Sequence, residues 1–102
     1  MKFSNEPKYN IVMLKLAFNT VSKLNMTASA MQGQYELAFS DQDVVDVIQS
    51  LTTADFHKSM PPEHIGFSAW QDVYKTKFKQ VLLYIKFQVN ANRELILSFK
   101  EK

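Results

Sequence analysis

Lysine, glutamine and tyrosine recur inside strand-like stretches in the second half of the chain, where they could contact a phosphodiester. Residues 55–60 read Asp-Phe-His-Lys-Ser-Met, residues 70–74 read Trp-Gln-Asp-Val-Tyr, and residues 98–102 read Ser-Phe-Lys-Glu-Lys. A sheet of such strands buries apolar side chains on one face and leaves cationic, hydrogen-bonding side chains on the other. This pattern predicts a cationic, hydrogen-bonding surface that is suited to contact with a phosphodiester.

RNA cleavage needs no nucleophile from the protein, because the ribose 2′-hydroxyl can attack the adjacent phosphorus. The protein must remove one proton, deliver another, and stabilise the charge that develops on the phosphate. Lysines supply that charge stabilisation. Tyrosine and lysine have reference pKa values near 10, which clustered positive charge lowers toward neutrality. The alternative interpretation is a solvated sheet face on which lysines protect an exposed edge.

Several other chemistries are disfavoured by the composition. The chain has no cysteine, so disulfides, thiol nucleophiles and the usual structural zinc ligands are absent. His57 and His64 do not match a known metal-ligand spacing, and we expect no metal and no cofactor. With Gly33 and Gly66 as its two glycines, the sequence has no glycine-rich nucleotide-binding loop. It also lacks the motif around a hydrolase serine.

Charge is unevenly distributed along the 102 residues. Residues 1–57 carry four lysines and six acids, a balance of −2, whereas residues 58–102 carry seven lysines and one arginine against four acids, a balance of +4. A basic half next to a mildly acidic half indicates a surface that faces a polyanion.

Length and hydropathy predict one domain over residues 1–102. The first residues are polar, and the longest apolar run, over residues 81–85, has five residues. This run is far too short to span a bilayer. We therefore expect a soluble, cytoplasmic protein without a membrane partner.

The first half of the chain is predicted to form short helices. Apolar residues follow Pro7 at three- and four-residue spacing, at Ile11, Leu14, Phe18 and Val21. Thr27 can cap a second helix over residues 28–35, although Gly33 weakens it.

Two capping signals predict further helices. Ser40 followed by Asp43 resembles a capping box and predicts a helix with one apolar side. Thr52 and Asp55 repeat the signal, which predicts a short helix within residues 53–60 that two consecutive prolines terminate.

The second half changes to a period of two. Residues 81–89 are apolar at odd positions and carry Tyr84 and Lys86 at even positions, and residues 95–100 repeat the pattern. Two such strands predict an antiparallel hairpin, with a further strand over residues 70–78 beside it.

The register of this hairpin follows from parity. If the two apolar stripes share a face, residues paired across the ladder have numbers with an even sum. A three-residue loop over 90–92 then sets Tyr84 opposite Ser98. Lys100 becomes a diagonal neighbour of Tyr84, about 7–8 Å away, which is close enough for both side chains to reach one phosphate.

The order and spacing of four motifs resemble the MqsR (motility quorum-sensing regulator) toxin family. The motifs are Asp55-Phe56-X-Lys58-Ser59-Met60, Trp70-Gln71-Asp72-Val73-Tyr74, Tyr84-X-Lys86 and Ser98-Phe99-Lys100-Glu101-Lys102. The resemblance is dense over residues 44–102 and looser over residues 7–43.

The resemblance implies an α+β fold like that of the RelE-like toxins, with helices packed against a small antiparallel sheet. It also implies the toxin of a type II toxin–antitoxin pair, a ribosome-independent, metal-independent and sequence-selective mRNA endoribonuclease that inhibits translation and growth.

By the family pattern the catalytic residues are Lys58, Gln71, Tyr84 and Lys100. Tyr84 would transfer protons, Lys58 and Lys100 would stabilise the phosphate, one of them as a possible base, and Gln71 would donate a hydrogen bond. RNA contacts are expected from Tyr74, Lys75, Lys77 and Lys86.

The implied partners are single-stranded mRNA and an antitoxin that combines a zinc-binding module with a helix-turn-helix domain. DNA would be contacted only through the antitoxin, which could add strands to an exposed sheet edge. The chain departs from the family pattern over residues 61–69 and at Lys75-Thr76, so we carry over no base preference. Two other interpretations stay open: a non-catalytic module that binds RNA or a partner, and a purely structural domain.

Overall fold

Short helices precede a four-stranded antiparallel sheet in the structure, a computed structural model that describes residues 3–62 and 69–101. The elements in chain order are α1 (Ile11–Ala17), the 3₁₀ helix η1 (Val21–Lys23), α2 (Ala28–Glu36), α3 (Asp41–Ser50), the 3₁₀ helix η2 (Thr53–Asp55), β1 (Phe56–Met60), β2 (Gln71–Phe78), β3 (Val81–Val89) and β4 (Leu95–Glu101). The α+β class is confirmed, and the arrangement is consistent with a RelE-like toxin fold.

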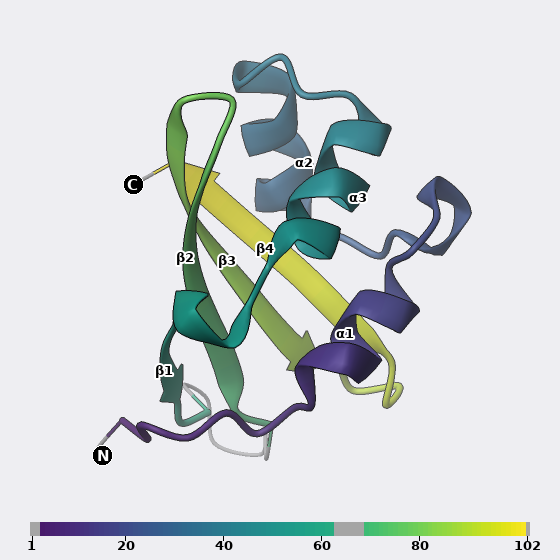
Figure 1. Cartoon of the computed structure of the whole chain (residues 1–102). Coiled ribbons are helices and arrows are strands. Elements are labelled where there is room, and N and C mark those ends of the chain that lie inside the picture. The colour runs from purple at the N-terminus through teal and green to yellow at the C-terminus, as the bar shows by residue number, and fades with distance from the viewer. Residues whose placement is uncertain (1–2, 63–68, 102) are drawn as a thin grey trace.

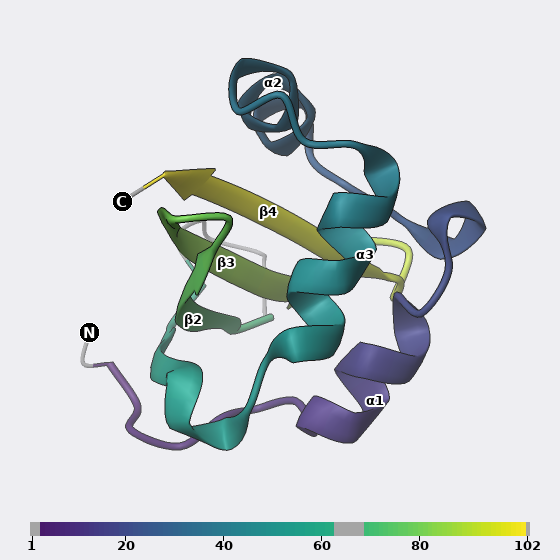
Figure 2. The same cartoon turned by 45° about the horizontal axis from the view of Figure 1, so that its top comes forward.

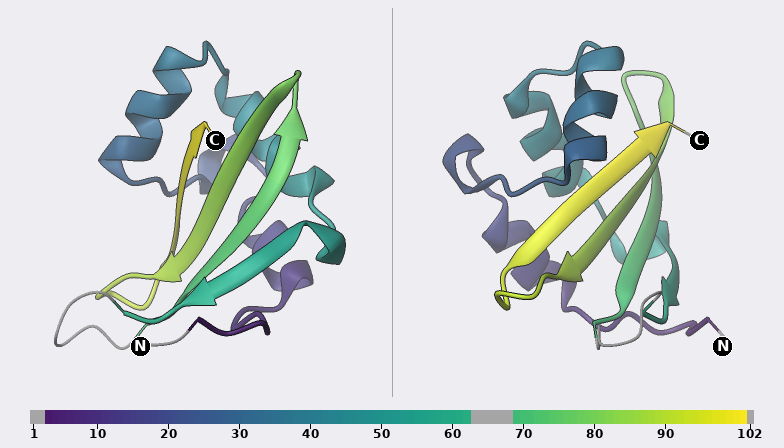
Figure 3. Two further views of the ribbon diagram at one scale, coloured as in Figure 1. Left: turned by 90° about the vertical axis from the view of Figure 1, so that its left-hand side faces the viewer. Right: turned by 180° about the vertical axis from the view of Figure 1, so that it is seen from behind.

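The strands form a meander in which sequence neighbours pair, in the order β1-β2-β3-β4. α1 and α3 cover one face of this sheet, whereas α2 lies beside β4 at its edge (Figures 1 and 2). Seen from behind, no helix among the described residues crosses β2 and β3 (Figure 3). We call this uncovered side of the sheet the open face.

α2 and α3 begin at the predicted capping residues. The Thr27 hydroxyl accepts from the Ala30 N–H at 3.1 Å at the start of α2. At α3 the Ser40 and Asp43 side chains cap each other's backbone N–H groups at 3.0 and 2.9 Å, as the sequence predicts. Asn10, which the sequence analysis did not identify, caps α1 through its side-chain oxygen.

The predicted helix within residues 53–60 is wrong. Thr52 and Asp55 do form a capping box, but it supports only the single turn of η2. The chain then becomes β1, which pairs with β2 and packs the Phe56 ring edge-on against Tyr74 at 5.5 Å between centroids. Pairing with a strand distant in sequence outweighs the local helical signal here.

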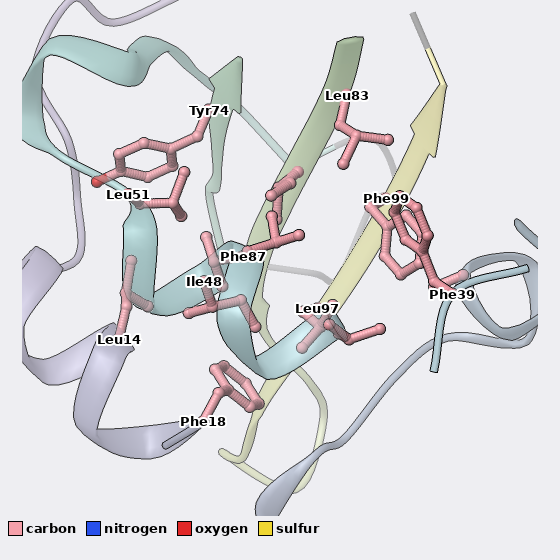
Figure 4. Packing of buried hydrophobic residues seen from close by; sticks show 14 residues of the cluster. Leu14, Phe18, Phe39, Ile48, Leu51, Tyr74, Leu83, Phe87, Leu97 and Phe99 are labelled. Carbon is pink, nitrogen blue, oxygen red and sulfur yellow. The ribbon is translucent and has the colours of Figure 1, made fainter. Parts of the chain in front are cut away.

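The core lies between the sheet and the two helices that cover it. Phe87 of β3 is fully buried at its centre, with its ring centroid 6.0 Å from Phe18 and 5.8 Å from Tyr74 (Figure 4). The buried members of the cluster are Leu14, Phe18, Ala30, Phe39, Val44, Val47, Ile48, Leu51, Tyr74, Leu83, Ile85, Phe87, Leu97 and Phe99. The odd-numbered residues of β3 and β4 point into this core, so the even-numbered ones lie on the open face.

The β3–β4 register differs from the predicted one by two residues, although its parity is correct. Tyr84 pairs directly with Lys100, and Lys86 pairs with Ser98. The connection runs from Asn90 to Glu94 because the Asn90 side chain accepts from two backbone N–H groups within it, including that of Glu94 at 3.0 Å. The longer loop moves Lys100 from a diagonal position to the position directly beside Tyr84.

The fully buried carboxylate of Asp72 anchors the N-terminal segment to β2. Its two oxygens accept from the Lys8 N–H at 3.0 and 2.9 Å, and one also accepts from the Tyr9 N–H at 2.9 Å. The Tyr9 hydroxyl in turn donates to the Trp70 carbonyl at 2.7 Å and accepts from the Val89 N–H at 3.3 Å. These bonds fix the segment that leads into α1.

Segments outside the sheet form backbone hydrogen bonds with both edge strands, β1 and β4. At β1, Ser4 and Ser59 exchange backbone hydrogen bonds of 2.8 and 2.9 Å. At β4, the Leu97 N–H and carbonyl pair with Asn25 and Thr27 at 2.9 and 3.0 Å. An added strand would therefore have to displace these contacts.

Within the described residues, no helix is long and apolar enough to cross a membrane.

Candidate active site

Tyr84 lies between two lysines on the open face. It is directly opposite Lys75 of β2 and directly opposite Lys100 of β4. Side chains in such cross-strand pairs have Cβ atoms about 4.5–5.5 Å apart. The Lys75 ammonium is 5.5 Å from the centre of the Tyr84 ring. Three strands thus place two cations beside one phenol.

A second row of side chains runs parallel to the first. Lys58 pairs with Val73, Val73 pairs with Lys86, and Lys86 pairs with Ser98. The Lys58 ammonium lies 3.8 Å above the centre of the Phe3 ring, which contributes a cation–π contact. This contact gives Lys58 a defined position at the β1 side of the row.

A hollow of about 290 Å³ joins the two rows. The described residues that line it come from all four strands and include one tyrosine, one histidine and three lysines, but no acid: His57, Lys58, Met60, Val73, Tyr84, Lys86 and Lys100. The predicted catalytic residues Lys58, Tyr84 and Lys100 therefore meet in one place. Here a phosphate would find several cations.

A second hollow of about 360 Å³ continues the surface toward α2. Tyr84, Lys86 and Lys100 line both hollows, while Gln32 and Glu36 of α2 line only the second. The phenol and two lysines thus form the ridge between them.

Gln71 does not join the other three predicted residues. It pairs with Met60, and its Nε2 donates to Gln88 Oε1 at 3.3 Å. Gln88 is four residues from Tyr84 along β3, or about 13 Å at the rise of a strand. Gln71 instead lines a neighbouring hollow of about 140 Å³.

The side-chain amide of Gln71 has one N–H group left to donate. Its Nε2 donates one hydrogen bond to Gln88, whereas its Oε1 is buried and has no partner among the described residues. The donor role expected of Gln71 stays a prediction.

Three of the predicted RNA-contacting residues lie on the open face, and one does not. Lys75, Lys77 and Lys86 alternate with core residues and so share this face. Tyr74 has the opposite parity, is 1% exposed and packs into the core (Figure 4). It cannot contact RNA on the open face, and its expected place among the RNA-binding residues is corrected accordingly.

Because Tyr74 is buried, the free energy of unfolding is expected to fall at alkaline pH. Burial, reinforced by the negative charge of Asp72, raises the pKa of Tyr74 to about 12. An unfolded tyrosine ionises near pH 10. As the pH rises, the unfolded state therefore loses this proton at a lower pH than the folded state does. The contribution of Tyr74 to the free energy of unfolding is fully present below pH 10 and is lost as the pH rises toward 12.

Between pH 9 and pH 11, we expect the free energy of unfolding to fall in both proteins. The fall should be smaller in the Tyr74→Phe variant than in the parent, by about 1–2 kcal/mol. Urea unfolding at both pH values measures the difference. Tyr35, whose side chain is 83% exposed, provides the matched control Tyr35→Phe, which should behave like the parent. Equal losses in the parent and Tyr74→Phe would contradict this explanation.

His57 is the site residue that the sequence analysis did not identify. It was assessed only as a metal ligand together with His64, which lies outside the described residues, as do residues 63–68 of the divergent segment. In the structure, the His57 ring lies 6.3 Å from the Tyr84 ring between centroids. The described residues contain no group of three or more acids and histidines arranged to hold a metal.

Comparison with known proteins identifies the family of this chain. Residues 6–101 match the profile of the family described as motility quorum-sensing regulator, toxin of MqsA. A protein of Escherichia coli (strain K12), the mRNA interferase toxin MqsR, is 35% identical over 80 residues, which cover 78% of this chain and 80% of the relative. The chain therefore belongs to the MqsR toxin family.

Proposed function

We propose that this protein is the toxin of a toxin–antitoxin pair and cleaves mRNA on its open face without a metal ion or the ribosome. The observation that carries the proposal is the placement of Tyr84 directly between Lys75 and Lys100, beside a hollow that Lys58 and Lys86 also line. Family membership and the name of the Escherichia coli relative, an mRNA interferase toxin, support the same activity.

In this proposal the lysines hold the scissile phosphate and stabilise the charge that grows on it. Lys100 of β4 lies beside Tyr84, Lys58 belongs to β1, and both line the hollow that would hold the phosphate. Fixed cations aimed at developing charge are a large source of rate enhancement. Tyr84 transfers a proton within this cluster.

The reaction is an attack of the ribose 2′-oxygen on the neighbouring phosphorus. The 2′-oxygen loses its proton and bonds to phosphorus, the bond from phosphorus to the 5′-oxygen breaks, and that oxygen takes up a proton. One fragment ends in a 2′,3′-cyclic phosphate and the other begins with a 5′-hydroxyl.

The shape of the open face favours single-stranded substrate. The two hollows meet at Tyr84, Lys86 and Lys100, so a strand across this ridge places one nucleotide in each hollow. Gln71 and Lys77 lie at the two ends of the open-face row on β2 that includes Val73 and Lys75, where they would contact flanking nucleotides.

An antitoxin protein is the second proposed partner, because the family is described as the toxin of MqsA. The zinc-binding and helix-turn-helix composition expected of it stays a proposal. Its contact with DNA would bring the toxin to DNA only indirectly.

The test is a digest of a long single-stranded RNA, free of ribosomes and with EDTA present. We expect the parent protein to give discrete fragments, and the Lys100→Met variant to lose at least about 100-fold in rate because it lacks a cation at the phosphate. Lys23→Met, which removes a lysine on η1 away from the open face, is the control and should cleave like the parent.

Intact RNA with folded parent protein would reject the proposal. Salt-dependent RNA binding without fragments would then support the non-catalytic binding module.

A further inference from the structure

His57 reaches the site because a β-bulge interrupts the pairing of β1 with β2. Phe56 pairs with Tyr74 and Lys58 pairs with Val73, so two steps along β1 correspond to one step along β2. Phe56 packs against the core, whereas His57 and Lys58 both line the hollow on the open face. Bulges often redirect a side chain in this way beside active sites.

The bulge brings the imidazole next to the proposed proton-transferring phenol. The His57 and Tyr84 rings lie 6.3 Å apart between centroids, with an angle of 41° between their planes. Both rings line the same hollow as Lys58 and Lys100, and His57 is exposed. A phosphodiester bound in this hollow lies within reach of both rings.

The reaction needs a proton acceptor and a proton donor at the same phosphate. Phenols and ammonium groups titrate near 10 in model peptides, so at neutral pH they carry protons and serve as donors. An imidazole titrates near 6.5 and is the side chain suited to accept a proton at neutral pH. Among the described residues, His57 supplies the imidazole that lines this hollow.

We propose that His57 is the general base of the cleavage reaction and that Tyr84 is the general acid. This inference rests on the proposed function. Neutral His57 takes the proton of the 2′-hydroxyl as the 2′-oxygen bonds to phosphorus. The bond from phosphorus to the 5′-oxygen breaks, and the leaving oxygen takes the phenol proton of Tyr84. The proton gained by His57 and the one lost by Tyr84 exchange with solvent afterwards.

The charges around His57 favour this assignment. Lys58 of β1, Lys86 of β3 and Lys100 of β4 line its hollow, and Lys75 of β2 lies next to Tyr84. The carboxylates of Glu36 and Glu101 line the adjoining hollow and not this one. The lysines can hold the anionic phosphate beside the imidazole and the phenol.

The experiment measures single-turnover cleavage of one defined RNA from pH 5 to pH 9 with saturating protein. We expect the parent rate to rise with pH through the range in which imidazoles titrate and then to level off. His57→Asn should lower the plateau by about 100-fold, the usual contribution of a general base, and should abolish this rise. RNA affinity and the thermal unfolding midpoint should stay near the parent values.

A rescue experiment separates a chemical role from a structural one. Imidazole added to the buffer should restore part of the rate of His57→Ala, because it can act from the vacated space. The same imidazole should not restore Tyr84→Phe, which retains its base and lacks the phenol proton.

The outcomes distinguish this inference from the proposed function. Cleavage by His57→Asn at the parent rate with the parent pH profile would overturn the role of His57 and leave the RNA-cleaving function intact. A slow variant that keeps the parent pH profile and gains nothing from imidazole would also overturn it, because the loss would then be structural. If the folded parent fails to cleave RNA at any pH, both proposals are overturned.

Discussion

The Tyr84→Phe variant is expected to cleave RNA about 100-fold or more slowly than the parent, with its fold and RNA affinity preserved. A positioned proton donor or acceptor typically contributes 10² to 10⁴ in rate. Phenylalanine keeps the ring and its contacts with His57 and Lys75 while removing only the hydroxyl. The loss should therefore appear in the single-turnover rate and not in binding.

The control for this variant is Tyr35→Phe, which removes a hydroxyl from the exposed surface of α2 outside the two ridge hollows. Its rate should equal the parent rate. The change at Tyr84 should also be less harmful with an RNA whose leaving 5′-oxygen is replaced by sulfur, because a thiolate leaves without protonation. Full activity of Tyr84→Phe on normal RNA would remove Tyr84 from the mechanism.

The Asp72→Asn variant is expected to lose about 2–4 kcal/mol of unfolding free energy. The Asp72 carboxylate is fully buried and accepts three hydrogen bonds from the backbone N–H groups of Lys8 and Tyr9. Hydrogen bonds to a charged acceptor are about twice as strong as neutral ones. An asparagine keeps one oxygen for the two N–H groups, but it removes the negative charge and turns an NH₂ group toward the Lys8 N–H, which now contacts both oxygens.

Urea unfolding measures this loss, and Asp46→Asn is the matched control. Asp46 is exposed on α3 and accepts only from Gln42 at 2.9 Å, so its replacement should change stability by less than about 0.5 kcal/mol. An Asp72→Asn protein as stable as the control would mean that the N-terminal segment is not held by these bonds.

Local signals in the sequence were sufficient to predict the starts of α2 and α3 and the face of each hairpin residue. The Ser40–Asp43 capping box lies within four residues, and the alternation over Val81–Val89 assigns Tyr84 and Lys86 to one face regardless of register. Both predictions are confirmed because neither depends on distant partners. The alternation also explains why the numbers of residues paired between β3 and β4 have an even sum, as they do for Tyr84 and Lys100.

Features that depend on distant contacts or on loop geometry could not be predicted. The sequence around Thr52 and Asp55 signals a helix, but residues 56–60 form β1 because they pair with residues 71–74. The β3–β4 register depends on the loop from Asn90 to Glu94, where Arg93 has a φ of 62°. A loop of this length is not evident from the flanking apolar stripes.

The assignment of Tyr74 was an avoidable error. Gln71 and Tyr74 are three residues apart in one strand, so side-chain alternation places them on opposite faces. Only one of them could lie on the open face with Tyr84. His57 was harder to place, because the bulge that turns it toward Tyr84 depends on the pairing of β1 with β2.

The most direct test of RNA cleavage by 2′-hydroxyl attack on the open face is an analysis of the fragment ends from the EDTA-treated digest. The RNA should include a copy in which the ribose at one mapped cleavage site is replaced by 2′-deoxyribose. The account predicts 2′,3′-cyclic phosphate and 5′-hydroxyl ends, with cleavage lost at the deoxy position and kept at the other sites. Cleavage that persists at the deoxy position, or fragments with 5′-phosphate ends, would contradict it.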